Sequence, residues 1–379
     1  MKGSIQRAVA AAAAVCLVAP LGVLAAAKAL PPPHGAILEA VLVSPSSINP
    51  LAGDTVALHV SLARPATIGV QVVDRDGYVI RALPAIDGKA GKNTLTWDGR
   101  DDGGAIVPDE AWSFRVVADG GTDQFFPALT HPAMNGIEPL SFSRTTATLQ
   151  YKLPAPSRVH IQAGTVTPGS GGSRSEEGPV LKTIADREPR AAGLIAEHWN
   201  GFDASGTVYV PDLPGFAVAI AATPLPEQSV ITFGNEKRPF LDYAGHRRGK
   251  SLFPEQSQSM HHAGLDVFHD LAPQLTLLPA PAAGRSAGVW TIPARKLKLR
   301  LDAEGPTART FAAEPGKIYV FVDTKLVATH DAKDAAEPLL ASLPDDGEHR
   351  IVVNWRSDYG PVAVAVARVR IAPKSSGTE

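Results

Sequence analysis

Histidine and methionine gather in one stretch of the chain, residues 242–269, which shows little hydrophobic periodicity. The candidate metal ligands are Met260, His261, His262 and His269, with Asp242, His246 and Asp266 nearby in sequence. Methionine with histidine suits copper, and histidine with aspartate suits zinc. Adjacent histidines point to opposite faces of a strand, so both reach one ion only where the backbone is irregular. The stretch is therefore a candidate metal site, although we favour a surface loop that carries histidines.

A second group of possible ligands follows Trp97 and consists of Asp98, Asp101 and Asp102. Clustered carboxylate oxygens suit calcium. An EF-type loop, however, needs aspartate or asparagine where Arg100 stands. We therefore favour a tight turn with solvated acidic side chains over a calcium site.

No set of residues typical of an enzyme emerges from the sequence. We do not expect a serine hydrolase. Ser170 stands between two glycines in a Gly/Ser-rich stretch, which cannot hold a nucleophile in strained geometry. The basic cluster of Arg247, Arg248 and Lys250 could touch an anionic polymer, but we interpret it as a solvated loop. We expect no enzymatic activity and no cofactor.

The tryptophans divide into two groups by their surroundings. Trp97, Trp199 and Trp355 end alternating apolar runs, so we expect them to pack in the core or at hairpin ends. Trp112 lies inside an alternating run and could instead be exposed, where it would stack on sugar rings. This residue keeps a carbohydrate-binding accessory module open as an alternative function.

The stretch around Trp97 occurs a second time around Trp199. Residues 96–109 read Thr-Trp-Asp-Gly-Arg-Asp-Asp-Gly-Gly-Ala-Ile-Val-Pro-Asp, and residues 198–212 read His-Trp-Asn-Gly-Phe-Asp-Ala-Ser-Gly-Thr-Val-Tyr-Val-Pro-Asp. In both, Asp-Gly or Asn-Gly supplies the positive φ of a tight turn, and proline begins the return strand. The match continues upstream through an alternating apolar run, so the chain contains an internal repeat.

The first copy resembles the FlgD-type immunoglobulin-like (Ig-like) domain over roughly residues 41–120. The resemblance rests on Val-Asp-x-Asp-Gly at 73–77, Arg-x-Leu at 81–83 and Leu-Thr-Trp-Asp-Gly-Arg-Asp-Asp-Gly at 95–103. The second copy is divergent, because it lacks the Asp-x-Asp-Gly turn and carries an insertion. The resemblance implies a β-sandwich and implies no chemistry.

The turn signals and alternating runs predict an all-β chain of tandem Ig-like β-sandwich domains. The expected order is a signal peptide at 1–27, a Pro-rich spacer at 28–37, a first FlgD-like domain at 38–122, a second at 138–234 with a Gly/Ser insertion at 165–179, an irregular His-containing linker at 235–271, a third Ig-like domain at 272–372 and a disordered tail at 373–379.

The N-terminus predicts export. Lys2 and Arg7 precede an apolar run, and Ala25 and Ala27 form a small-x-small cleavage site. The run falls short of the roughly 20 residues of a membrane span, so cleavage is favoured over a retained anchor. The single cysteine, Cys16, lies inside the run, so the mature chain would carry no thiol. The formal net charge of −2 argues against nucleic-acid binding.

These features together predict an exported, non-enzymatic scaffold or docking protein of the bacterial cell envelope. We expect it to be periplasmic or extracellular and to have no membrane span after cleavage. Its partner would be an unidentified cell-envelope protein or polysaccharide. The alternatives are a copper- or zinc-handling protein that uses residues 242–269, and a carbohydrate-binding module. A direct role in the flagellar hook is disfavoured, because FlgD-type hook proteins leave by the flagellar export channel and carry no such leader.

Overall fold

The computed structural model describes residues 37–75, 77–125, 135–167, 176–238, 240, 243, 274–278, 283–286, 288–302, 316–335, 337–357 and 362–372. The expected signal peptide, nearly all of the Pro-rich spacer, the polar tail and most of the 235–271 linker lie outside these residues. They stay predictions.

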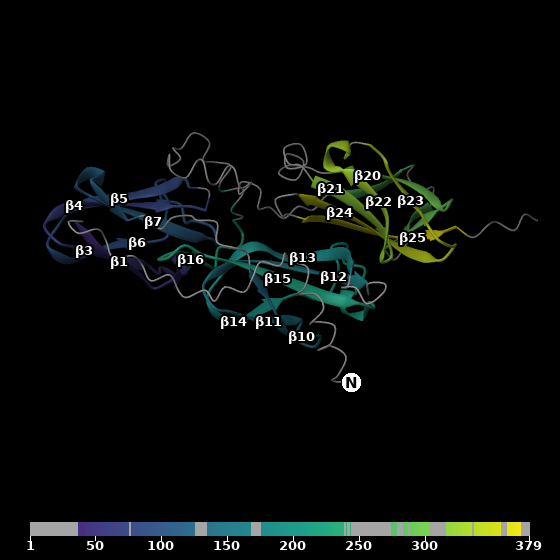
Figure 1. The fold of residues 1–379 in the computed structure, drawn as a ribbon, viewed down its shortest axis with the longest axis horizontal. Coiled ribbons are helices and arrows are strands. Elements are labelled where there is room, and N and C mark those ends of the chain that lie inside the picture. Colours follow the sequence, from purple (N-terminus) through teal and green to yellow (C-terminus); the bar gives the residue numbers. More distant parts are fainter. Residues whose placement is uncertain are drawn as a thin grey trace, which may run out of the picture.

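The described chain is all-β, as predicted, and its strands fall into three groups along the long axis of the molecule (Figure 1). We call these groups domain 1, domain 2 and domain 3, in chain order. Among the described residues the helical segments are short, such as the 3-10 turns Pro50–Ala52 and Val210–Asp212. None of them is long and apolar enough to cross a membrane.

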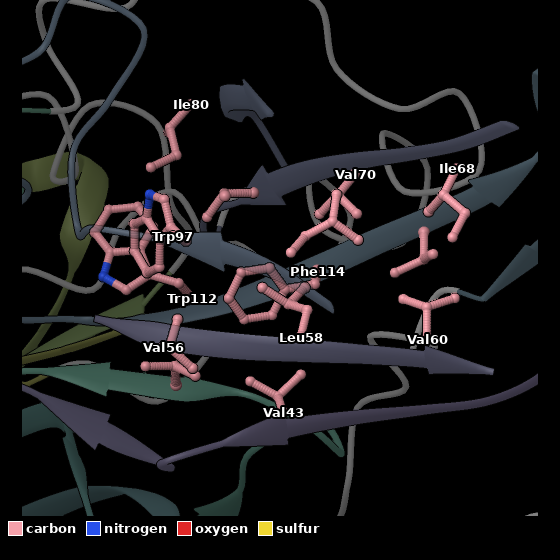
Figure 2. Close-up of a cluster of buried hydrophobic side chains, with 14 of the residues drawn as sticks. Val43, Val56, Leu58, Val60, Ile68, Val70, Ile80, Trp97, Trp112 and Phe114 are labelled. Atoms are coloured by element: carbon pink, nitrogen blue, oxygen red, sulfur yellow. The ribbon is translucent and has the colours of Figure 1, made fainter. Parts of the chain in front are cut away.

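Domain 1 contains two facing sheets. Its strands are β1 (Leu38–Ser44), β2 (Ser47–Ile48), β3 (Val56–Leu62), β4 (Ala66–Val73), β5 (Val79–Gly88), β6 (Gly91–Trp97), β7 (Ala111–Ala118) and β8 (Asp123–Phe125). One sheet has the order β1-β3-β6, and the other runs β2-β16-β7-β4-β5 with β8 beside β7. Strand β3 alternates as expected, since Val56, Leu58, Val60 and Leu62 are buried between the sheets. Figure 2 shows the first three of them.

The strand β16 (Val230–Thr232) comes from far along the chain. It follows domain 2 in sequence, within the range 138–234 that we expected to form that domain. In the structure it pairs in parallel with β2 and antiparallel with β7, so it completes a sheet of domain 1. In Figure 1 it is the green strand beside the blue and purple ones. Three residues carry too little periodicity to reveal a long-range pairing.

Domain 2 repeats the first sheet of domain 1. Its strands are β9 (Asn135–Ile137), β10 (Pro139–Ser143), β11 (Thr148–Leu153), β12 (Ser157–Thr167), β13 (Glu176–Arg190), β14 (Gly193–His198) and β15 (Phe216–Pro224). The three-stranded sheet β10-β11-β14 matches β1-β3-β6, and the second sheet has the order β13-β12-β15-β9. The expected insertion at 165–179 is partly regular, because its two ends continue β12 and β13 as an antiparallel pair.

Domain 3 is also a two-sheet structure. Its strands are β17 (Gln274–Leu278), β18 (Ala283–Ser286), β19 (Val289–Ile292), β20 (Lys296–Asp302), β21 (Gly316–Val322), β22 (Lys325–Asp331), β23 (Leu339–Ser342), β24 (Glu348–Ser357) and β25 (Val362–Ile371). The sheets are β17-β20-β23 and β18-β19-β25-β24-β21-β22. One apolar cluster that includes Leu299, Val320 and the fully buried Trp355 lies between them.

Candidate functional site

The two tryptophan loops are held by the same hydrogen bonds. Trp97 Nε1 donates to the carbonyl oxygen of Arg100 at 2.9 Å, and Trp199 Nε1 donates to that of Phe202 at 2.9 Å. One antiparallel bridge closes each loop. The repeat seen in the sequence therefore extends to the three-dimensional geometry, and each indole fastens its loop to the core.

A glycine in each loop lies under a ring of the same domain. Gly99 has φ 72° and Gly201 has φ 83°, values that favour glycine. A Cβ on Gly99 would lie 2.3 Å from Cγ of Pro50, and one on Gly201 would lie 2.3 Å from Cε2 of Tyr209. The Asp-Gly and Asn-Gly turns are thus needed for conformation and for space.

We expect Gly99→Ala to destabilise domain 1 at least twice as much as Gly104→Ala. Both residues have positive φ, which costs a side chain about 1–2 kcal/mol. Only the new methyl at 99 meets a neighbour, because nothing lies within 4 Å of a Cβ at 104. Urea denaturation followed by tryptophan fluorescence measures both losses, and equal losses would show that the contact with Pro50 is unimportant.

The acidic side chains of the first loop are occupied by backbone groups. Asp98 Oδ1 accepts from the N–H of Arg100 at 3.1 Å, and Asp101 Oδ1 accepts from that of Ala105 at 3.0 Å. These bonds belong to the turn itself, so the geometry supports a tight turn rather than a calcium loop. Among the described residues, no group of three or more His, Cys, Asp or Glu side chains could hold a metal ion.

Asp102 covers the free edge of β5, the last strand of its sheet. Its N–H donates to the carbonyl oxygen of Ile80 at 2.9 Å, and its Oδ1 accepts from the N–H of Ala82 at 3.1 Å. Free strand edges invite pairing with other chains. The first loop therefore blocks an edge of domain 1 that would otherwise be open.

Domain 2 covers the matching edge, that of β13, in a different way. The N–H of Ala204 donates to the carbonyl oxygen of Leu181 at 2.9 Å, but alanine supplies no side-chain oxygen. Domain 3 covers the preceding residue of the same edge: Asn354 Nδ2 donates to the carbonyl oxygen of Val180 at 2.8 Å, and Asn354 Oδ1 accepts from the N–H of Val180 at 2.9 Å. The divergence of the second loop thus coincides with the place where domain 3 docks.

The contact between domains 2 and 3 is mainly apolar around this amide. Phe321 and Val352, from β21 and β24, belong to the buried apolar cluster of domain 2. Asn354 itself has no exposed surface. At the rim, Arg368 Nη1 donates to the carbonyl oxygen of Thr207 at 3.5 Å. The second sheet of domain 3 therefore packs against domain 2 on its outer face.

Domains 1 and 2 meet at a buried carboxylate. The side chain of Glu110 is 2% exposed and pairs with Arg75 of domain 1 at 3.1 Å. It also forms a close ion pair with Arg158 of β12, and it accepts from the N–H of Ala111 at 2.6 Å. Both guanidinium groups pair with the same carboxylate, so the burial of each arginine depends on Glu110.

An ionic cluster in domain 3 surrounds His349, which is buried. Its Nδ1 is 2.9 Å from Asp323 Oδ2, and its Nε2 is 3.1 Å from Asp345 Oδ1. Burial acts to lower the pKa of His349, but the hydrogen bonds and charges of the two carboxylates outweigh it, so the pKa is raised. The pKa of Asp345 is lowered, chiefly by the N–H of Gly347.

Domain 3 is expected to lose stability as the pH rises through the range above the ordinary histidine pKa of about 6.5. Because folding raises the pKa of His349, the stabilisation is fully present below the unfolded-state pKa and is lost as the pH passes the folded-state pKa. Denaturation of the wild-type chain and of His349→Gln between pH 5.5 and 8.5 measures this. A wild-type slope that persists in the variant would contradict the assignment.

The predicted metal ligands Met260, His261, His262 and His269 lie outside the described residues, so that prediction stays untested. Trp112 is described, and the interpretation of it as an exposed sugar platform is wrong because it is fully buried. Trp112 packs edge-on against Trp97, with ring centroids 6.1 Å apart (Figure 2).

Sequence reasoning missed the two side chains that join the domains. Asn354 stands inside the apolar run Ile-Val-Val-Asn-Trp, where a polar residue is conspicuous and could have been noticed. Glu110 follows Val-Pro-Asp and carries no such signal, because its partners lie far away in sequence.

Comparisons with known proteins agree with the loop geometry of domain 1. Residues 46–122 match the FlgD Ig-like domain. The chain is 32% identical over 85 residues to the basal-body rod modification protein FlgD of Salmonella typhimurium, which covers 22% of this chain and 37% of that protein. The same values hold for FlgD of Salmonella typhi. The chain thus spans well under half the length of the curated relatives it matches.

Several solved structures align with most of the chain at low sequence identity. One concerns host-cell-surface retention of a bacterial ice-binding adhesin, with 13% identity, a TM-score of 0.17 and coverage of 88% of this chain and 98% of that one. Another contains the fibronectin(III)-like modules of Clostridium thermocellum CbhA, with 8% identity, a TM-score of 0.20 and coverage of 90% and 98%. At such TM-scores the chains do not superimpose as wholes.

Proposed function

We propose that this chain is an exported, non-enzymatic scaffold of the bacterial cell envelope, which docks a macromolecular partner through Ig-like domains. Domain 2 is a second, divergent copy of the FlgD-type domain, and domain 3 is a third Ig-like sandwich. The mature protein is periplasmic or extracellular after its leader is removed. Its partner is a cell-envelope protein or polysaccharide.

The observation that supports this proposal is the way the domains are joined. Buried side chains, Glu110 at one junction and Asn354 at the other, connect the sandwiches into a single row. Interfaces between domains of one chain are usually small and permit relative motion. A row fixed by buried polar pairs instead keeps its outer surfaces at set distances, which is what a scaffold needs.

Capture from a detergent-solubilised envelope fraction tests the function. The full mature chain is expected to retain one envelope protein or polysaccharide in a saturable manner. The variants Glu110→Gln and Asn354→Leu should bind it at least ten-fold more weakly, because the row is then less rigid. The exposed substitution Asn135→Leu, on the edge strand β9, serves as the matched control. Failure to retain any envelope component, or substrate turnover by the purified chain, would contradict the proposal.

A further inference from the structure

Residues 230–238, together with Phe240 and Tyr243, fasten domain 2 to domain 1, and we call them the clip. Their backbone extends the second sheet of domain 1. The N–H of Ile231 donates to the carbonyl oxygen of Ser46 at 2.9 Å, and the N–H of Phe233 donates to that of Ile48 at 3.0 Å. The clip therefore occupies a strand-acceptor site between β2 and β7.

The side chain of Thr232 makes the pairing specific. Its hydroxyl donates to the carbonyl oxygen of Pro108 at 2.7 Å, and it accepts from Trp112 Nε1 at 2.8 Å and from the N–H of Glu110 at 3.1 Å. All these atoms are buried. Valine, which has the same shape, would leave the indole and peptide N–H groups without this acceptor, and buried donors without an acceptor destabilise the pairing.

Polar groups after the strand hold the backbone of the tryptophan loop. Asn235 Nδ2 donates to the carbonyl oxygen of Val107 at 2.9 Å, and Arg238 Nη1 donates to that of Ile106 at 2.6 Å. In return, Asp109 accepts from the N–H of Asn235 at 2.7 Å. The acceptor site thus recognises the sequence of the clip as well as an extended backbone.

Two aromatic residues of the clip complete the end of the domain 1 core. Phe240 and Tyr243 pack against Trp112, with ring centroids 6.3 Å and 6.1 Å from it. The guanidinium carbon of Arg75 lies 4.1 Å from the centroid of the Phe240 ring. Trp112 is therefore buried partly by the clip, and this burial makes it unable to stack on a sugar ring.

The clip is the main apolar link between the two domains within the described part of the chain. The core cluster of domain 1 contains Val230, Phe240 and Tyr243 but no residue from β9 to β15. The core cluster of domain 2 contains none from β1 to β8. Outside the clip, polar contacts join the domains: the ionic group at Glu110 and, from the connector that precedes the clip, Gln228 Oε1, which accepts from the N–H of Val43 at 2.7 Å. When the clip opens, little other apolar surface holds the domains together.

The connector between β15 and the clip is short. It spans residues 225–229, and Gln228 within it has φ 60°, in the left-handed region that non-glycine side chains disfavour. Short hinges favour exchange of a terminal element between copies, because an extended hinge relieves the strained turn.

We propose that the acceptor site of domain 1 also fits the clip of a second copy of this chain, so that two chains exchange clips and form a closed dimer. The donor and the acceptor are present in every copy, and the exchanged contacts are identical to those within one chain. No new complementary surface is required, because domain 3 follows the clip along the chain and is exchanged with it, so that it packs against domain 2 of the other copy through the same contacts. Only the hinge at 225–229 adopts a different conformation. The proposal is independent of the identity of the envelope partner.

Cysteine trapping tests the exchange in the full mature chain. Ser47 and Ile231 are Cα partners in the pairing of β2 with β16. One preparation carries Ser47→Cys and another carries Ile231→Cys, and the two are mixed, warmed below the unfolding transition and oxidised. We expect a disulfide-linked heterodimer. The initial rate of heterodimer formation should rise at least ten-fold when Thr232→Val is added to both chains, because that change speeds the opening of the intrachain clip.

A chain with both cysteine substitutions is the positive control, and a mixture of Ser47→Cys with Thr223→Cys on β15 is the negative control. If the double variant closes its own disulfide but the mixture gives no more heterodimer than the negative control, exchange does not occur and the proposal fails. If the double variant fails to close its disulfide, the β2–β16 pairing itself is wrong, and the proposal fails with it. Light scattering should give twice the monomer mass for the trapped species.

Discussion

Glu110→Gln is expected to destabilise domain 1 and its contact with domain 2 by about 3–5 kcal/mol, the usual cost of removing one partner from a buried ion pair. The change keeps the shape of the side chain and removes its charge. Arg75 and Arg158, whose side chains are 10% and 14% exposed, would then lose the buried carboxylate that they share. Urea denaturation monitored by Trp97 and Trp112 fluorescence gives the free energy of unfolding.

Glu188→Gln is the matched control. Glu188 also pairs with an arginine, Arg190, but its side chain is 53% exposed. Exposed pairs contribute about 0–1 kcal/mol, so this variant should unfold almost as the wild type does. A loss below 1 kcal/mol for Glu110→Gln would mean that water reaches the junction and that the carboxylate does not hold the domains.

A triple replacement of Glu110, Arg75 and Arg158 by leucine or methionine separates stability from specificity. Apolar residues of similar size often replace buried ionic groups at no cost. If the triple variant is as stable as the wild type but domain 1 moves relative to domain 2 in solution scattering, the ionic group fixes orientation rather than stability. That outcome would agree with the rigid row that a scaffold requires.

The sequence predicts the parts of this fold that depend on local patterns. Alternation places Val56, Leu58 and Val60 inside the first sandwich, since successive side chains of a strand face opposite ways. The Asp-Gly turn predicts the positive φ of Gly99 in the same local way. Both features recur in domain 2 because the same residues recur there.

The junctions could not be predicted, because they depend on pairings between distant segments. Val230, Ile231 and Thr232 form too short a run to distinguish a strand of domain 2 from one of domain 1. Exposure of Trp112 stayed open because the pattern of its own strand does not reveal Phe240 and Tyr243, which pack against it from beyond domain 2. A buried glutamate likewise looks like any surface glutamate until Arg158 is placed beside it.

Asn354→Leu is expected to weaken the junction of domains 2 and 3 by about 2–4 kcal/mol. Leucine has nearly the same volume but leaves the N–H and the carbonyl oxygen of Val180 unpaired, and each buried orphan costs about 1–3 kcal/mol. Asn354→Asp should cost at least as much. A carboxylate still accepts from the N–H of Val180, but it cannot donate to the carbonyl oxygen and buries a charge.

The hydrogen-exchange rate of the Val180 N–H measures directly whether Asn354 still covers this amide. In the wild type this amide should be protected as strongly as the core of β13, and in both Asn354 variants its protection should fall to that of an exposed strand edge. Protection in β3 of domain 1 should not change, because that strand does not contact domain 3. If Val180 keeps its protection in Asn354→Leu, another group covers the β13 edge. The presence of alanine at 204, where the first loop has Asp102, would then be unrelated to the docking of domain 3.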